Sequence, residues 1–85
     1  MYAVVFTKQA LRILRKVPRN VSLLIREKLE QLAVDPDAPN NNVTKLVGRA
    51  GYRLRVGDWR VIYELQDQQL VLIVIKIGPR GEVYE

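Results

Sequence analysis

The apolar residues of this 85-residue chain change their spacing near Asn42, and this change limits the folds that the chain can adopt. Before Asn42 they recur three or four residues apart, a spacing typical of amphipathic helices. After Asn42 they alternate with polar residues or run on continuously, a pattern typical of strands. The sequence therefore predicts an α+β fold with its helices before most of its strands, in one domain covering residues 1–85.

The first half of the chain predicts a strand followed by two helices. Residues 2–7 are rich in β-branched and aromatic side chains and favour a strand. Thr7 is placed to cap a helix from Lys8 to about Lys16, which Pro18 ends, and Asn20 can cap a second helix to about Val34. The buried stripes of this helical hairpin are predicted to hold Ala10, Leu11, Leu14 and Val17, and then Val21, Leu24, Ile25, Leu29 and Leu32.

The second half predicts a loop and three strands. Residues 35–42 contain two prolines and several Asp and Asn residues, which favour turns. Residues 52–56 alternate, Gly57-Asp58 fits a two-residue type II′ turn, and residues 59–65 return. After a second reversal, residues 69–77 predict an apolar strand that lies centrally and is covered on both faces. The predicted order is β-α-α-β-β-β, an antiparallel sheet packed against the helical hairpin.

The two-residue turn fixes which side chains of the hairpin lie opposite one another. Arg55 then lies opposite Arg60, and Arg53 shares their face, while apolar and aromatic side chains occupy the other face. Like charges directly opposite destabilise a sheet by roughly 0.2–1 kcal/mol, whereas guanidinium groups bind phosphate through paired hydrogen bonds. Arg80 and Tyr84, beyond the last strand, extend the cluster. A solvated sheet face is the plainer interpretation, but convergence from three segments favours an anion site.

Composition narrows the chemistry that such a site can perform. Fourteen Lys and Arg against nine Asp and Glu leave a net charge of +5, which favours a polyanionic partner, nucleic acid first and an acidic protein second. With no Cys and no His, thiolate and imidazole catalysis are excluded, as are disulfides and Cys or His metal ligands. No cofactor is expected. The longest apolar run, residues 70–75, is far shorter than the roughly 20 residues of a membrane span, so a cytoplasmic protein is expected.

Three segments together resemble the RelE/ParE superfamily of bacterial and archaeal toxins. They are YAVVFTKQALRILRKVP, KLVGRAGYRLRVGDWRVIYEL and VLIVIKIGPRGEVYE, and the resemblance covers essentially the whole chain. It implies a microbial-RNase-like fold and a toxin–antitoxin operon. RelE-like members cleave mRNA in the ribosomal A site. The ribose 2′-hydroxyl attacks the adjacent phosphate and leaves a 2′,3′-cyclic phosphate and a 5′-hydroxyl.

Carried over position by position, the resemblance implies a catalytic set. Arg60 and Arg80 would clamp the scissile phosphate, Arg53 and Arg55 would hold flanking phosphates, and Tyr84 would orient the 2′-hydroxyl or accept its proton. The family has lysines at positions 53 and 55, and an arginine cannot act as a base. Proton transfer would then fall to Tyr84 or be weakened. Secondary contacts to RNA are expected from Lys45, Arg49, Arg12, Arg15 and Lys16.

The resemblance also implies partners. They are an antitoxin whose acidic segment covers the arginines, the ribosome with its mRNA and rRNA, and operator DNA bound through the antitoxin. Two other functions stay open: a ParE-like module that poisons DNA gyrase without being an enzyme, and a catalytically weak homologue that mainly binds its antitoxin. Pro79, where many relatives have His or Lys, is a further departure from the family pattern.

Overall fold

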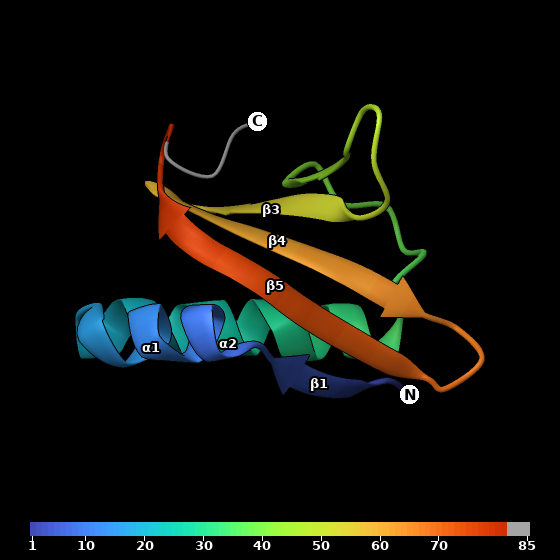
Figure 1. Ribbon diagram of the computed structural model, residues 1–85, viewed down its shortest axis with the longest axis horizontal. Coiled ribbons are helices and arrows are strands. Elements are labelled where there is room, and N and C mark those ends of the chain that lie inside the picture. Colours follow the sequence, from blue (N-terminus) through green and yellow to red (C-terminus); the bar gives the residue numbers. More distant parts are fainter. Residues whose placement is uncertain (82–85) are drawn as a thin grey trace.

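The computed structural model describes residues 1–81 and shows two helices against one sheet (Figure 1). The elements are β1 (Ala3–Phe6), α1 (Lys8–Lys16), α2 (Arg19–Val34), β2 (Val43–Lys45), β3 (Tyr52–Val56), β4 (Trp59–Gln66) and β5 (Val71–Pro79). The described strands form one five-stranded sheet in the order β1-β5-β4-β3-β2. β1 pairs with β5 in parallel, and the other neighbours pair antiparallel. The predicted α+β class is confirmed.

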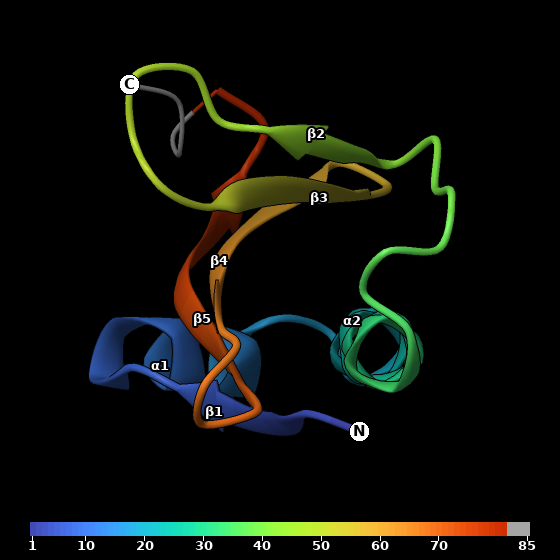
Figure 2. The ribbon, with the colours of Figure 1, turned by 90° about the vertical axis from the view of Figure 1, so that its right-hand side faces the viewer.

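The helices lie towards one end of the sheet, and β3, which carries Arg53 and Arg55, lies towards the other. Both helices lie at the β1 end, whereas β2 and β3 form the far end (Figures 1 and 2). One core joins the two layers, since Leu14 of α1 and Leu29 of α2 are buried with Val61, Tyr63 and Leu72 of the sheet. The hairpin of β3 and β4 therefore extends beyond the helices while its inner face stays attached to the core.

The predicted stripe of α1 is largely confirmed, because Ala10, Leu14 and Val17 are buried and Leu11 is half-buried. In α2 the buried residues include Ile25, Leu29 and Leu32, as predicted, with Val21 half-buried. Leu24 is the exception, since 42% of it is exposed. It precedes Ile25 by one residue, which turns it about 100° away from the centre of the stripe.

The two helix starts differ in how well the sequence predicts them. The Thr7 hydroxyl oxygen accepts a hydrogen bond from the Ala10 N–H at 3.2 Å, as expected of an N-cap, and donates one to the Ile75 carbonyl at 2.7 Å. The predicted Asn20 cap is wrong. α2 begins at Arg19, its N-cap position is Pro18, and no side chain caps it. The fixed φ of proline suits a helix entrance, so the helix starts directly after it.

The hairpin register is confirmed, with Val56 opposite Trp59, Arg55 opposite Arg60 and Arg53 opposite Ile62. Gly57 has φ +58°, as the first turn position of a type II′ turn requires. The sequence missed β2, in which Thr44 pairs with Arg53. This strand has three residues, too few for an alternating pattern to be recognised.

The prediction for the last strand is partly wrong. β4, not β5, is the middle strand, and β5 lies between β4 and the short β1. Leu72 and Val74 are buried, but the alternate residues Val71, Ile73 and Ile75 are only half-buried. The apolar run therefore reflects one covered face and one partly covered face. β1 pairs with β5 only as far as Val74, and beyond that point the Gln9 amide donates to the Ile77 carbonyl and accepts from the Ile77 N–H, both at 3.2 Å.

The loop before β3 is held against the sheet at Gly51. The Leu46 N–H donates to the Gly51 carbonyl at 3.0 Å. Gly51 has φ +112°, a conformation that side chains with a Cβ rarely adopt. A Cβ there would lie 2.9 Å from the Tyr63 carbonyl oxygen and 3.2 Å from the Glu64 Cγ. The loop can approach β4 this closely only with glycine at position 51.

Tyr63 links the core to an expected pH dependence. Burial, helped by the neighbouring Tyr52 whose ring centroid lies 5.3 Å away, raises the pKa of Tyr63 to about 12. Because the phenol ionises near pH 10 in the unfolded chain, folding stability is full below pH 10 and falls as the pH rises from 10 towards 12. Between pH 9 and 11 the wild-type protein should lose about 1 kcal/mol more unfolding free energy than Tyr63→Phe. Urea unfolding at both pH values checks this, and equal losses in the two proteins would contradict it.

Candidate nucleic-acid interface

Three arginines converge with three uncharged polar residues on one face of the sheet. They line a pocket of about 180 Å³, here called the arginine pocket, whose residues are Asn41, Asn42, Thr44, Arg53, Arg55 and Arg60. The strand pairing explains this grouping, because directly opposite residues of neighbouring strands point to the same face. One row across the strands contains Thr44 and Arg53, and the next contains Asn42, Arg55 and Arg60.

Arg55 is an exposed arginine held by the segment before β2. Its Nη2 donates to the Asn42 Oδ1 at 3.0 Å, and its backbone N–H donates to the Asn42 carbonyl at 2.8 Å. Asn42 is itself held by the Asn40 Oδ1, which accepts from its N–H at 2.9 Å. These bonds limit the rotamers of Arg55, so its guanidinium is already placed at the pocket before any ligand binds.

Arg60 is buried, with 7% of its surface exposed, which argues against the plainer interpretation of a solvated sheet face. Its Nη1 donates to the Gly57 and Trp59 carbonyls, each at 3.1 Å. The guanidinium thus satisfies two carbonyls of the hairpin turn while it lines the pocket. The sequence register places the residue on the correct face but does not predict this bond to its own turn.

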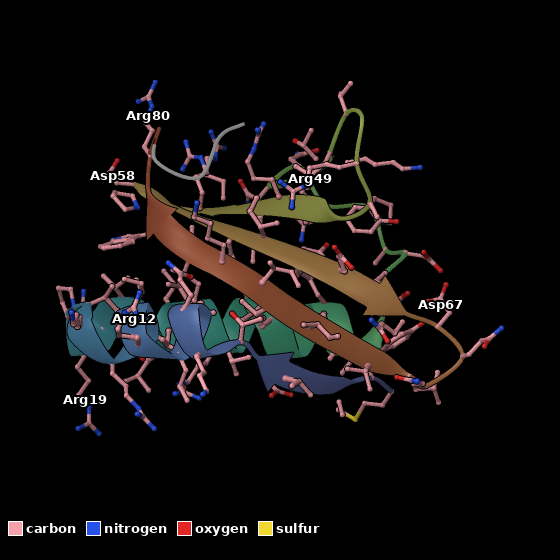
Figure 3. All side chains as sticks on the ribbon, viewed as in Figure 1. Arg12, Arg19, Arg49, Asp58, Asp67 and Arg80 are labelled. Carbon is pink, nitrogen blue, oxygen red and sulfur yellow. The ribbon has the colours of Figure 1, made fainter. Side chains whose placement is uncertain are left out.

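Arg80 comes from a different segment and lies beside the same turn. Its backbone N–H donates to the Asp58 carbonyl at 2.8 Å, two residues past Gly78, which pairs with Arg60. In Figure 3 its side chain extends outward from that end of the sheet, next to Asp58. Arg80 is exposed and is not part of the arginine pocket. Tyr84 lies outside the described residues.

The secondary candidates are spread over other surfaces, and none lines the arginine pocket. Lys45 pairs with Tyr52, so it points to the opposite face from Arg53, and it borders a hollow with Asp37, Glu64 and Asp67. Arg49 is exposed in the loop before β3, and the remaining three are exposed on α1 (Figure 3): Arg12, Arg15 and Lys16.

Tyr2 lines the hollow that contains Lys45 and Asp67, and its pKa is raised. The Tyr2 hydroxyl donates to the Asp67 Oδ1 at 2.7 Å, and this bond raises the pKa of Tyr2. The phenol therefore serves as a hydrogen-bond donor that ties β1 to the turn between β4 and β5. It lies at the end of β4 away from the hairpin turn, so it takes no part in the arginine pocket.

Sequence reasoning missed Asn41, Asn42 and Thr44. The only available signal is the polar-apolar-polar order of Asn42, Val43 and Thr44, which marks a very short half-buried strand. Their amide and hydroxyl groups bring hydrogen-bonding capacity that arginines alone lack. A larger hollow of about 450 Å³ lies between α1 and the end of β5, and its lining is mostly apolar. We base the site on the smaller pocket because the cationic groups converge there.

The part of the chain that the structure describes contains neither a candidate metal site nor a candidate membrane-spanning helix. Residues 1–81 contain no group of three or more His, Cys, Asp or Glu side chains that could hold a metal ion. Among the same residues, no helix is both long enough and apolar enough to span a membrane. The arginine pocket is lined by guanidinium, amide and hydroxyl groups.

The structure thus combines a basic pocket on a hairpin with an α+β sheet backed by two helices. The family described as "ParE toxin of type II toxin-antitoxin system, parDE" matches residues 4–84. The chain therefore belongs to the RelE/ParE superfamily of type II toxin–antitoxin toxins, as the sequence resemblance indicated.

Solved structures place the similarity within the RelE-like branch. The archaeal RelE–RelB complex from Pyrococcus horikoshii OT3 is 31% identical, with a TM-score of 0.80, covering 96% of this chain and 98% of that one. The intact RelBE toxin–antitoxin complex of Escherichia coli is 26% identical, with a TM-score of 0.81, covering 96% and 100%. The mRNA interferase toxin RelE of E. coli K12 is 28% identical over 85 residues, which is 98% of this chain and 90% of the relative.

Proposed function

We propose that this protein is the toxin of a type II toxin–antitoxin system and acts as a ribosome-dependent endoribonuclease that cleaves mRNA in the A site. The observation that carries the proposal is the convergence of Arg53, Arg55 and Arg60 on one pocket with Asn and Thr side chains. Guanidinium forks match phosphate oxygens, and amides match base edges, so the lining suits single-stranded RNA. Similarity to proteins named mRNA interferase supports the same function.

The proposed reaction is an internal phosphoryl transfer. The ribose 2′-oxygen forms a bond to the adjacent phosphorus while the bond from phosphorus to the 5′-oxygen breaks. The products are a 2′,3′-cyclic phosphate and a 5′-hydroxyl. Negative charge accumulates on the phosphorane-like transition state. Arg60 and Arg80 would stabilise it, while Arg53 and Arg55 would hold the flanking phosphates. Tyr84 would orient the 2′-hydroxyl or accept its proton.

The proposed dependence on the ribosome follows from the chemistry of the arginines, which are not bases, and from the exposed positive charge around the site. Arginines stabilise charge but do not abstract protons, so the alignment of the 2′-oxygen with the scissile bond has to supply much of the acceleration. In the A site, contacts with rRNA would hold the mRNA so that its 2′-oxygen is aligned with the scissile bond. The exposed positive charge of Arg49, Arg80 and α1 would contact the surrounding rRNA phosphates.

The proposed antitoxin partner is an acidic, partly amphipathic segment that covers the arginine face. Arg55 lies directly opposite Arg60 and Arg53 shares their face, so the carboxylates of an acidic segment would meet three guanidinium groups close together. Two solved relatives are complexes with a second protein: the P. horikoshii structure is a RelE–RelB complex, and the E. coli structure is the intact RelBE toxin–antitoxin complex. The resulting complex would bind operator DNA through the antitoxin, and the toxin would act in the cytoplasm, where ribosomes translate mRNA.

A translation system reconstituted from purified components tests the proposed function. The protein should produce mRNA fragments with 5′-hydroxyl ends at A-site codons when ribosomes are present, and leave the same mRNA intact when they are absent. Primer extension maps the ends, and phosphorylation by a kinase without prior phosphatase treatment identifies the 5′-hydroxyl. Cleavage at the same positions in free RNA would contradict ribosome dependence.

The gyrase hypothesis is kept as the alternative because the matching family is described as ParE. The same preparation is added to DNA gyrase and supercoiled DNA. Intact mRNA on ribosomes together with trapped gyrase–DNA cleavage complexes would replace the proposed function by this one. Intact mRNA and unaffected gyrase would instead support the catalytically weak homologue.

A further inference from the structure

The proposed reaction needs a proton for the departing 5′-oxygen, and the arginines are poor sources of it. A guanidinium stays protonated under all ordinary conditions, whereas the ammonium group of a lysine can give up its proton. Positions 53 and 55 both carry arginine. A lysine on the face that carries these arginines could supply the proton.

The strand pairing places Lys76 on that face. In the β4–β5 pair, Lys76 lies opposite Ile62, and in the β3–β4 pair Ile62 lies opposite Arg53. Thr44, Arg53, Ile62 and Lys76 thus form one row across four strands. Since opposite residues share a face, the Lys76 side chain leaves the sheet on the side of the arginine pocket.

A register shift in β5 produces this orientation. Tyr63 pairs with Val74, but Ile62 pairs with Lys76, so Ile75 is an extra residue in β5. Leu72 and Val74 are buried on the helix side before the shift, and Ile77 is buried after it. Without the extra residue, Lys76 would follow Val74 onto the helix side. Such bulges re-aim side chains and occur often beside active sites.

Lys76 is also close enough to act on a phosphate held by Arg60. Gly78 is the residue directly opposite Arg60, so Lys76 is its diagonal neighbour, a relation that separates residues by about 7–8 Å. Gly78 contributes no side chain between them. Lys76 is half-buried and borders the larger hollow beside α1, because β5 has no strand neighbour beyond Val74 on that side. Lys76 lines this hollow and not the arginine pocket itself, so its flexible side chain has to extend past Gly78 to bring the ammonium group to the phosphate.

The other lysines lie elsewhere. Lys8, Lys16 and Lys28 are on the helices, and Lys45 pairs with Tyr52 and so points to the opposite face. Within residues 1–81, Lys76 is the one lysine that the register directs to the arginine face.

We propose that Lys76 protonates the 5′-oxygen as it leaves, an inference that rests on the proposed function. As the 2′-oxygen binds phosphorus, the Lys76 ammonium gives one proton to the 5′-oxygen, whose bond to phosphorus breaks. Lys76 becomes a neutral amine and is reprotonated by water. The proton of the 2′-hydroxyl leaves separately, to Tyr84 or to solvent, so that charge and atoms balance.

The test compares two variants on two substrates under single-turnover conditions with programmed ribosomes. Lys76→Ala and Lys76→Arg should both cleave ordinary mRNA about 100-fold more slowly than wild type, with half-saturating concentrations unchanged within about 3-fold. The second mRNA carries a sulfur in place of the 5′-bridging oxygen. A thiolate leaves without protonation, so on this mRNA both variants should match wild type within about 3-fold.

Two controls separate proton donation from charge and folding. Arg19→Ala removes an equal charge from α2, outside the proposed RNA contacts, and should leave both rates unchanged. Arg53→Ala should be slow on both substrates, because phosphate binding does not depend on the leaving group. Full activity of Lys76→Arg, or failure of the sulfur substrate to restore Lys76→Ala, would overturn the assignment while the proposed function stands. If the wild-type protein leaves mRNA intact on ribosomes, both the assignment of Lys76 and the proposed function are wrong.

Discussion

Replacing Arg60 with alanine is expected to reduce ribosome-dependent mRNA cleavage by about 100- to 1000-fold, the range for removing one donor that stabilises transition-state charge. Arg60 lines the arginine pocket and is the most buried of its three guanidinium groups. The same change leaves the Gly57 and Trp59 carbonyls without their 3.1 Å bonds and should lower the unfolding free energy by about 1–2 kcal/mol. Single-turnover cleavage and urea unfolding measure the two effects separately.

Two further variants show which effect belongs to the chemistry. Arg60→Lys keeps the charge but not the fork, so its activity should lie between those of alanine and wild type. Arg19→Ala removes an exposed charge at the start of α2 and should change cleavage by less than about 3-fold. If Arg60→Ala stayed folded and cleaved mRNA at the wild-type rate, the arginine pocket would not be the catalytic site.

Replacing Gly51 with alanine is expected to cost at least about 2 kcal/mol of unfolding free energy. Two costs add at this position: the strain of φ +112° with a side chain, and a Cβ placed 2.9 Å from the Tyr63 carbonyl oxygen. The contact is with backbone in the middle strand, so it is relieved only by moving the loop. Urea unfolding with an unchanged slope checks the prediction, since a changed slope would report an altered denatured or native state.

Gly48 offers a matched control in the same loop. It has φ +78°, but a Cβ there would meet nothing within 4 Å. Gly48→Ala therefore carries the strain without the collision and should cost about 1 kcal/mol. Equal losses for the two variants would show that the close approach of Gly51 to β4 contributes nothing.

The parts of the fold that local chemistry determines could be predicted from the sequence. Gly57-Asp58 sets a turn of known length, and turn length determines which residues pair, so the whole β3–β4 register followed. The bounds of α1 followed from the Thr7 cap and from Pro18. Each of these features depends on residues within a few positions of one another.

The parts that long-range contacts determine could not be predicted. β2 is three residues long and exists because β3 is available to pair with it. The extra residue in β5 arises from pairing with β4, and position 75 carries isoleucine, which does not indicate a bulge as Gly or Pro would. The alternation after Asn42 therefore predicted strands, but neither their number nor the face of Lys76.

The candidate site shows the same division. Arg53, Arg55 and Arg60 were predicted to share one face because the turn fixes their register, and the structure brings them together in one pocket. Asn42 was missed because its bond to Arg55 spans thirteen positions. The burial of Arg60 was missed because its partners are carbonyl groups, which carry no residue-specific signal.

The parallel pair of β1 and β5 determines when a newly made chain can become toxic. β1 begins at residue 3 and its partner begins at residue 71, so almost the whole chain separates two adjacent strands. Helix α1 also packs mainly on β5, so most of the surface that covers the first helix is missing until the last strand has been synthesised. Contacts of such separation form late and slowly. If the protein acts as proposed, a nascent chain is therefore expected to be inactive towards the ribosome that makes it, and an antitoxin to have until the sheet closes to bind the arginine face.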